Sequence, residues 1–169
     1  MDKVKKRWIS IYVENEIGVL ARISGLFSGK AYNIDTLSVG ETEDRSVSRM
    51  TIGVTSDDKT FEQIKKQLNR SVEVIKVLDF TDIPIHMKEL MFVKINSCTE
   101  KDKAEAFRIA SVYGVKVSDY NRNTVLLECV QSEDKNESLL KLLSATYGYR
   151  LEVVRSGAVA VEAVSYTDR

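Results

Sequence analysis

The sequence predicts an α+β protein made of two tandem ferredoxin-like βαββαβ domains, each with an antiparallel sheet. Three observations predict this fold: strand-like and helix-like patterns follow one another in that order, the order recurs in the second half, and the only proline, Pro84, lies between the halves. Proline cannot donate to a strand ladder and disfavours helix at the residue before it. We therefore expect a linker at 81–87 between a domain at 1–80 and a domain at 88–169.

The first half supplies each element of this order in turn. Strands are predicted where apolar and polar residues alternate, as at Ile9, Ile11 and Val13. Helices are predicted where apolar residues recur every three or four positions, and an Asp before such a run indicates a helix cap. The expected elements are strand 8–13, turn 15–18, helix 19–30, strand 33–39, polar connection 41–45, strand 49–54, a helix capped at Asp57-Asp58 with the apolar face Phe61, Ile64 and Leu68, and strand 72–80.

The second half repeats the order of elements, though not the residues. Thr99 and Asp102 form a capping-box pattern that predicts a helix start, and Gly114 and Gly148 predict helix ends. The segment Arg155-Ser156-Gly157 is expected to interrupt the last strand. The expected elements are strand 91–95, a helix after Thr99 with Phe107 and Ala110 inside, strand 115–117, strand 125–129, a helix with Leu139, Leu142 and Leu143 on its apolar face, a strand that begins at Leu151 and Val153, and a further strand at Val159 and Val161.

Sheets of this kind leave one face bare of helices and carry edge strands, and both features favour association with further copies. The balance of 25 basic and 25 acidic residues gives a net charge of +0, which weakens repulsion between copies. The same balance argues against a nucleic-acid or anionic-membrane binder, because such proteins need a basic excess. We therefore expect a homodimer or a higher homo-oligomer that binds neither nucleic acid nor membrane.

The chain shows no sign of export. No apolar run approaches the ~18 residues of a membrane span. The basic start at residues 1–7 is not followed by the apolar segment of a secretory signal. Cys98 and Cys129 are far apart and form no Cys-x-x-Cys pattern, so two buried, reduced thiols are favoured over a disulfide. These features are typical of a cytoplasmic protein.

The residues of a catalytic centre are not apparent. An enzyme needs a nucleophile–base pair, a metal cluster or a cofactor loop. The single histidine, His86, falls in the predicted linker, where a solvated surface residue is the simpler interpretation. One histidine and two separated cysteines do not make a zinc site, and the phosphate- and dinucleotide-binding glycine motifs are absent. We expect this chain to have no catalytic residues, no metal and no cofactor of its own.

One segment has the chemistry of a small-molecule site. Residues 14–20 join the first strand to the first helix, where free N–H groups and a partial positive charge favour a carboxylate. Gly18 removes the side chain that would block its approach. Asn15 and Asn33 carry amides that can serve either end of a zwitterion, particularly across a subunit contact. An apolar wall for an aliphatic side chain is expected from Ile17, Val19 and Ile34.

A plain turn is the competing interpretation of this segment. Asn and Gly are ordinary turn residues, and the local pattern by itself favours a turn without a ligand. The second half carries Asn96-Ser97-Cys98-Thr99-Glu100 at the corresponding place, so the fold does not demand Asn-x-x-Gly. A ligand site at this position therefore belongs to the first half alone.

Several motifs together give the chain a resemblance to a known family. Those of the first half are Glu14-Asn15-Glu16-Ile17-Gly18-Val19-Leu20, Gly25-Leu26-Phe27, Tyr32-Asn33-Ile34, Ser38-Val39-Gly40 and Ser48-Arg49-Met50-Thr51-Ile52. They resemble the amino-terminal ACT domain of acetolactate synthase small subunits. In the second half, Lys88-Glu89-Leu90-Met91-Phe92-Val93-Lys94-Ile95 and Arg155-Ser156-Gly157 are similar to the carboxy-terminal domain of that family.

The resemblance implies a regulatory chain with no catalysis of its own. It implies ACT domains paired side by side, with valine, leucine or isoleucine bound at the pair interface as feedback inhibitor. Asn15 and Gly18 match the loop that holds the effector, Asn33 matches the other recurrent contact, and Val19, Leu20 and Ile34 neighbour them. The implied partner is the catalytic subunit, which uses thiamine diphosphate, Mg²⁺ and FAD.

Three other functions remain as alternatives. One is a stand-alone ACT-domain sensor of a different amino acid that controls another enzyme. A second is an acylphosphatase-like hydrolase, which is disfavoured because Glu14 and Glu16 would repel phosphate in the first turn. A third is an RNA-recognition module, which needs stacking aromatic residues that Met50, Ile52 and Val54 do not supply.

Overall fold

The structure is a computed structural model that describes residues 4–164, and these fall into two compact units. The first unit holds residues 4–86 together with 159–164, and the second holds residues 87–158. The predicted domains at 1–80 and 88–169 divide the chain by sequence, whereas the compact units group residues 159–164 with the first half.

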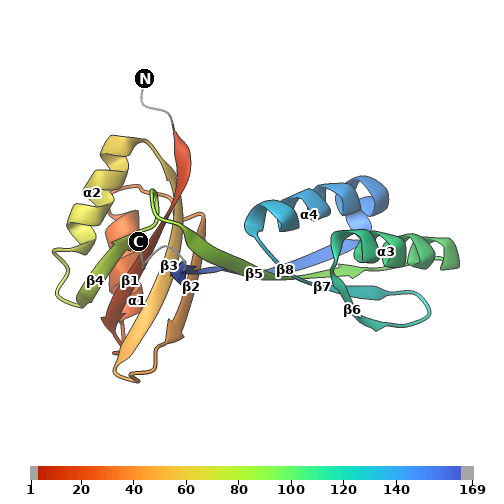
Figure 1. Ribbon diagram of the computed structural model, residues 1–169, viewed down its shortest axis with the longest axis horizontal. Helices are drawn as coiled ribbons and strands as arrows, with labels where there is room; N and C mark the ends of the chain where they lie inside the picture. The colour runs from red at the N-terminus through yellow and green to blue at the C-terminus, as the bar shows by residue number, and fades with distance from the viewer. Residues whose placement is uncertain (1–3, 165–169) are drawn as a thin grey trace. The chain divides into compact units, whose positions relative to one another are not determined.

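The first unit has the expected order of strands and helices. Its sheet has the strand order β2-β3-β1-β4 with antiparallel pairing throughout, and α1 and α2 cover one face (Figure 1). β2 and β4 are therefore the edge strands. The elements are β1 (Lys5–Glu14), α1 (Val19–Ser28), β2 (Thr36–Glu41), β3 (Val47–Ser56), α2 (Asp58–Leu68) and β4 (Val74–Asp79).

The core of the first unit lies between its helices and its sheet. Alternation in β1 sends three fully buried side chains, those of Ile9, Ile11 and Val13, to the helix-covered face. The other buried members are Val19, Ile23 and Phe27 from α1, Met50, Ile52 and Val54 from β3, and Phe61, Ile64 and Leu68 from α2. As predicted, Asp57 caps α2, because its side chain accepts a hydrogen bond from the Thr60 amide.

Residues 159–164 join the first unit through hydrogen bonds that the sequence does not reveal. Arg49 Nη2 donates to the Ala160 carbonyl over 3.0 Å, and the Ala163 amide donates to the Pro84 carbonyl over 2.9 Å. Ala160 and Ala163 are both buried. These contacts explain why the end of the described chain groups with the first sheet.

The second unit repeats the topology, with the strand order β6-β7-β5-β8. Its helices lie together on one face of the sheet (Figure 1). The capping box at Thr99 and Asp102 opens α3, and Gly114 ends it with a φ of 64°, both as predicted. The elements are β5 (Ile85–Ile95), α3 (Glu100–Tyr113), β6 (Lys116–Tyr120), β7 (Val125–Gln131), α4 (Glu133–Tyr147), a 3₁₀ turn (Gly148–Arg150) and β8 (Leu151–Glu162).

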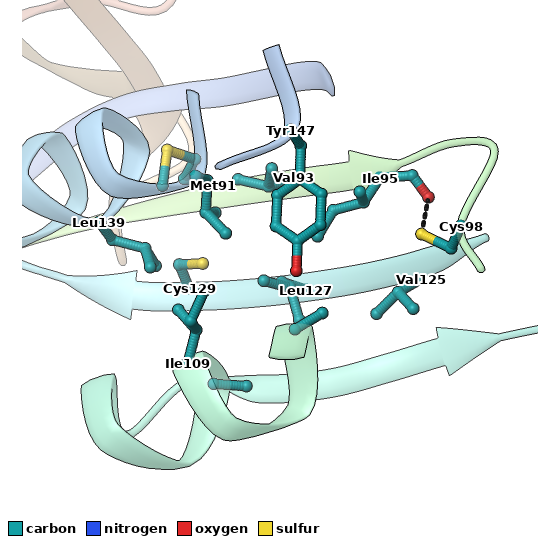
Figure 2. Packing of buried hydrophobic residues seen from close by; sticks show 13 residues of the cluster. Met91, Val93, Ile95, Cys98, Ile109, Val125, Leu127, Cys129, Leu139 and Tyr147 are labelled. Atoms are coloured by element: carbon teal, nitrogen blue, oxygen red, sulfur yellow. Dashed lines mark hydrogen bonds between the residues drawn. The ribbon is translucent and has the colours of Figure 1, made fainter. Parts of the chain in front are cut away.

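Both cysteines are free and buried in the second core, as predicted. Figure 2 shows Cys129 on β7 among aliphatic side chains, and Cys98 with its thiol directed at the Ile95 carbonyl, 3.4 Å away. Burial raises the pKa of the Cys129 thiol to about 11 and that of the Tyr147 hydroxyl to about 12. Both groups therefore stay protonated near neutral pH.

Several expected boundaries and burials were wrong. α1 ends at Ser28 rather than at residue 30, and β5 begins at Ile85, inside the predicted linker. β8 runs without a break to Glu162, although Gly157 has a φ of 76°. Phe107 is 37% exposed and contacts the Tyr120 ring edge-on, and Leu142 is 38% exposed, so neither side chain belongs to the core.

Candidate functional site

The turn between β1 and α1 leaves the start of α1 open. Gly18 occupies the N-cap with a φ of 86° and provides no side-chain cap. The first N–H groups of a helix have no acceptor within it, and residues with side chains rarely adopt this φ. Gly18 is exposed, and the adjoining Ile17 side chain is 100% exposed. The turn thus combines uncapped donors, helix-dipole charge and free access.

Asn15 anchors this turn to the β2–β3 hairpin. Its Nδ2 donates to the Arg45 carbonyl over 2.9 Å and to Glu41 Oε1 over 3.3 Å, while its Oδ1 accepts from Ser48 Oγ over 2.9 Å. Both amide hydrogens are therefore used within the chain. One lone pair of Oδ1 remains, which makes the Asn15 amide an acceptor for an incoming donor.

The apolar residues proposed for the site lie in different environments. Leu20 is 45% exposed beside the open turn, whereas Val19 is buried in the core and offers the turn only its backbone. Ile34 is partly buried and packs against the core. Of the predicted wall, Ile17 is thus the exposed member, and Leu20, which the resemblance adds, is partly exposed beside it.

Asn33 lies at the opposite end of the first sheet from Asn15. β2 pairs with β3 from Thr36 opposite Gly53 to Glu41 opposite Ser48. Asn33 precedes Thr36, at one end of this ladder, and Asn15 contacts residues at its other end. The two ends of β2 are about five residue steps apart, which is roughly 17 Å. Asn33 Nδ2 donates to Asp35 Oδ1 over 3.0 Å, and the Asp35 amide donates to the Gly53 carbonyl over 2.9 Å, just before β2, which starts at Thr36 rather than at residue 33. One chain does not bring the two asparagines together.

Two charged residues at the open turn were absent from the prediction. A Cβ added to Gly18 would lie 3.4 Å from Arg22 Nη1, and Arg22 Nε pairs with Glu73 over 2.5 Å. At the other end of the turn, Glu41 contacts Asn15. The spacing of four residues from Gly18 to Arg22 in a helix is a signal that the sequence contains. Glu41 could be found only from the strand register.

The corresponding turn of the second unit is closed by its own side chains. Thr99 and Asp102 cap α3 reciprocally, and Arg150 Nη1 donates to the Ser97 carbonyl and to Asp102 Oδ2, each over 3.0 Å. The Arg150 guanidinium and the Thr99 donors hold the pKa of the Asp102 carboxyl well below its usual range. The backbone amides of Thr99 and Asp102 at the start of α3 are thus occupied.

Comparison with known proteins assigns both halves of the chain. The family described as AHAS small subunit-like ACT domain matches residues 9–76, and the family described as small subunit of acetolactate synthase matches residues 88–164. The acetolactate synthase small subunit of Aquifex aeolicus is 42% identical over 159 residues, which cover 94% of this chain and 82% of that protein. The chain belongs to the acetolactate synthase small-subunit family.

Further relatives of this family agree. The probable acetolactate synthase small subunit of Archaeoglobus fulgidus is 38% identical over 92% of this chain and 96% of its own length. The crystal structure of the acetolactate synthase small subunit of Thermotoga maritima, 31% identical, matches with a TM-score of 0.83 over 94% of this chain and 98% of that chain. These relatives confirm the two βαββαβ repeats and support a regulatory-subunit role.

Two observations on residues 4–164 bear on other functions. Within this range, three or more His, Cys, Asp or Glu side chains do not gather in any arrangement able to hold a metal ion. No helix in the same range is both long and apolar enough to span a membrane.

Proposed function

We propose that this chain is the regulatory subunit of an acetolactate synthase. In this proposal it binds a separate catalytic subunit, raises its activity and confers feedback inhibition by valine or another branched-chain amino acid, leucine or isoleucine. Thiamine diphosphate, Mg²⁺ and FAD belong to the catalytic subunit. The observation that carries the effector site is the open, uncapped turn at Gly18, beside the acceptor oxygen of Asn15.

The effector site is proposed to form between two copies of the chain. β2 is an edge strand, and antiparallel pairing of β2 with its copy would set Thr36 of one chain near Glu41 of the other. Asn33, which precedes Thr36, would then approach the open turn of the partner. Two observations favour this pairing: β2 is an edge strand of the sheet formed by the described residues, and the neighbouring Val39 and Leu20 are 49% and 45% exposed.

The proposed ligand geometry follows from the charges of an α-amino acid. Its carboxylate would lie against the N–H groups at the start of α1, where Gly18 permits close approach. Its ammonium would be received by amide oxygens, and its aliphatic side chain by Ile17 and Leu20 of one chain and Ile34 of the other. A ligand held by two chains stabilises one arrangement of the pair, which is the differential affinity that allosteric control requires.

An activity assay on the reconstituted complex tests this proposal. The full chain is co-purified with the catalytic subunit, and acetolactate formation is measured with and without each branched-chain amino acid. We expect higher activity with the chain present and loss of that gain on adding valine. If the chain neither binds the catalytic subunit nor changes its response, a calorimetric titration with a panel of amino acids tests the alternative, a stand-alone ACT-domain sensor of another enzyme.

A further inference from the structure

The open turn of the first unit lies between two opposite charges. Arg22 stands on the first turn of α1, and Glu41 ends the edge strand β2. Arg22 approaches the position where a Gly18 side chain would begin, and Glu41 touches the Asn15 amide. The backbone of the turn, residues 15–18, thus has a cation at its helix end and an anion at its strand end.

Arg22 can bind an anion placed on the Gly18 backbone. Its Nη1 lies 3.4 Å from the space that a Gly18 Cβ would fill, and that space is vacant because the residue is glycine. Nε is engaged with Glu73 over 2.5 Å, which fixes the guanidinium and leaves the Nη groups for a second acceptor. A guanidinium is a good partner for a carboxylate, because two of its N–H groups can bind both oxygens at once. Arg22 is 50% exposed, so a ligand can reach it.

Glu41 can bind a cation beside Asn15. Its hydrogen bond from Asn15 Nδ2 is long, 3.3 Å, compared with 2.9 Å for the bond from Nδ2 to the Arg45 carbonyl. The weaker bond leaves most of the acceptor capacity of the carboxylate unused. Together with the free lone pair of Asn15 Oδ1, Glu41 supplies an acceptor set suited to an ammonium group.

We propose that Arg22 and Glu41 select a zwitterion at the open turn, Arg22 by pairing with the carboxylate and Glu41 by pairing with the ammonium. This inference rests on the proposed effector function and specifies its chemical class: an α-amino acid rather than the 2-keto acid with the same side chain. A 2-keto acid carries the carboxylate but lacks the ammonium, so it can satisfy Arg22 and leaves Glu41 without a partner. A subunit with such a pair binds the amino acid more tightly than its keto analogue.

Calorimetric titration of the full-length chain tests this selection with two ligands, valine and the 2-keto acid that has the valine side chain. The wild-type chain is expected to bind valine more tightly than the 2-keto acid. Glu41→Gln is expected to weaken valine binding about tenfold, the size of one charge-assisted hydrogen bond, and to leave the keto acid unchanged. Arg22→Gln is expected to weaken both ligands, because both carry the carboxylate, whereas Arg22→Lys retains part of the affinity.

Two matched controls separate a local effect from a general loss of charge. Glu43→Gln removes an exposed carboxylate from the same hairpin, and Arg70→Gln removes an exposed guanidinium from the same unit; neither is expected to change the affinities. Thermal unfolding of each variant checks that the first unit stays folded after the Arg22–Glu73 pair is lost. The inference is overturned if Glu41→Gln behaves like Glu43→Gln, or if it weakens both ligands equally. If the wild-type chain binds no branched-chain amino acid, the proposed effector function is wrong, and this inference is wrong with it.

Discussion

The two units of this chain use the same strand-to-helix turn in opposite ways. In the first unit, the turn before α1 has a glycine N-cap with no capping side chain and an exposed backbone. In the second, the turn before α3 is closed by the Thr99–Asp102 capping box and by Arg150, which bonds the Ser97 carbonyl and the Asp102 carboxylate.

The comparison shows that the fold does not require a ligand at this turn. Both turns start a helix that packs on a four-stranded sheet, and both helices are stable parts of a core. The second unit caps its helix start from within, through the reciprocal bonds of Thr99 and Asp102. The first unit has no side-chain cap, and although the Val19 amide bonds the Glu16 carbonyl, a ligand can reach the other donors of its exposed turn. An effector site in this protein is therefore expected in one unit only.

The largest expected effect is the loss of valine binding in Gly18→Asp. The new carboxylate would lie beside Arg22, occupy the position of the effector carboxylate and repel it, at a φ of 86° that side chains rarely adopt. We expect affinity to fall at least tenfold, with activation of the catalytic subunit retained and inhibition lost. The control is Gly114→Asp, the same change at a φ of 64° in the second unit. If valine still inhibits the complex that contains Gly18→Asp, the effector site does not lie at this turn.

A second effect, on stability rather than on binding, is expected at alkaline pH, and it should arise in the second unit. Burial raises the pKa of Cys129 to about 11, while an unfolded thiol ionises near pH 8.5. Between these values the unfolded state loses its proton first, so the free energy of unfolding falls as pH rises, by about 3 kcal/mol across the whole interval. Urea titrations followed by circular dichroism measure this loss.

Two controls assign this pH dependence to the second unit. Emission of Trp8, the only tryptophan, reports the first unit, where we expect less dependence on alkaline pH. Cys129→Ala should reduce the slope and leave the part that comes from Tyr147, whose pKa is also raised by burial. An unchanged slope in Cys129→Ala would show that the thiol is not the source.

The smallest effect is expected from the cap of the closed turn. Thr99→Ala removes the side chain that accepts from the Asp102 amide, which should lower the free energy of unfolding by about 1 kcal/mol and leave valine affinity unchanged. Ser132→Ala is the matched control, because Ser132 lies at the N-cap of α4 and makes no side-chain cap bond. This substitution should leave the free energy of unfolding almost unchanged. Weaker valine binding in Thr99→Ala would contradict the assignment of the two turns.

Much of this architecture could be predicted because local patterns carry it. Alternation in β1 and helical spacing in α2 identify the elements, and the capping residues Asp57 and Thr99 mark helix starts where the structure has them. The sequence predicts a strand from residue 33, whereas β2 starts at Thr36. The grouping of residues 159–164 with the first unit involves a long-range bond from Arg49, which the sequence does not reveal.

The candidate site could be predicted only in part, because strand pairing brings some of its residues together. The Asn15–Gly18 turn is a continuous motif, so its chemistry can be read directly from the sequence. Glu41 comes beside Asn15 through the pairing of β2 with β3, and that register is not visible in the residues themselves. The separation of Asn15 and Asn33 within one chain also depends on this register.

The most direct test of the central claim is a valine titration of the full-length chain, labelled for NMR and followed by backbone amide shifts. We expect the amides of Gly18, Val19 and Asn33 to move together with a single affinity, and those of Thr99 and Asp102 to stay fixed. Shifts at the second turn, or none at the first when valine is saturating, would contradict an effector site at the open turn.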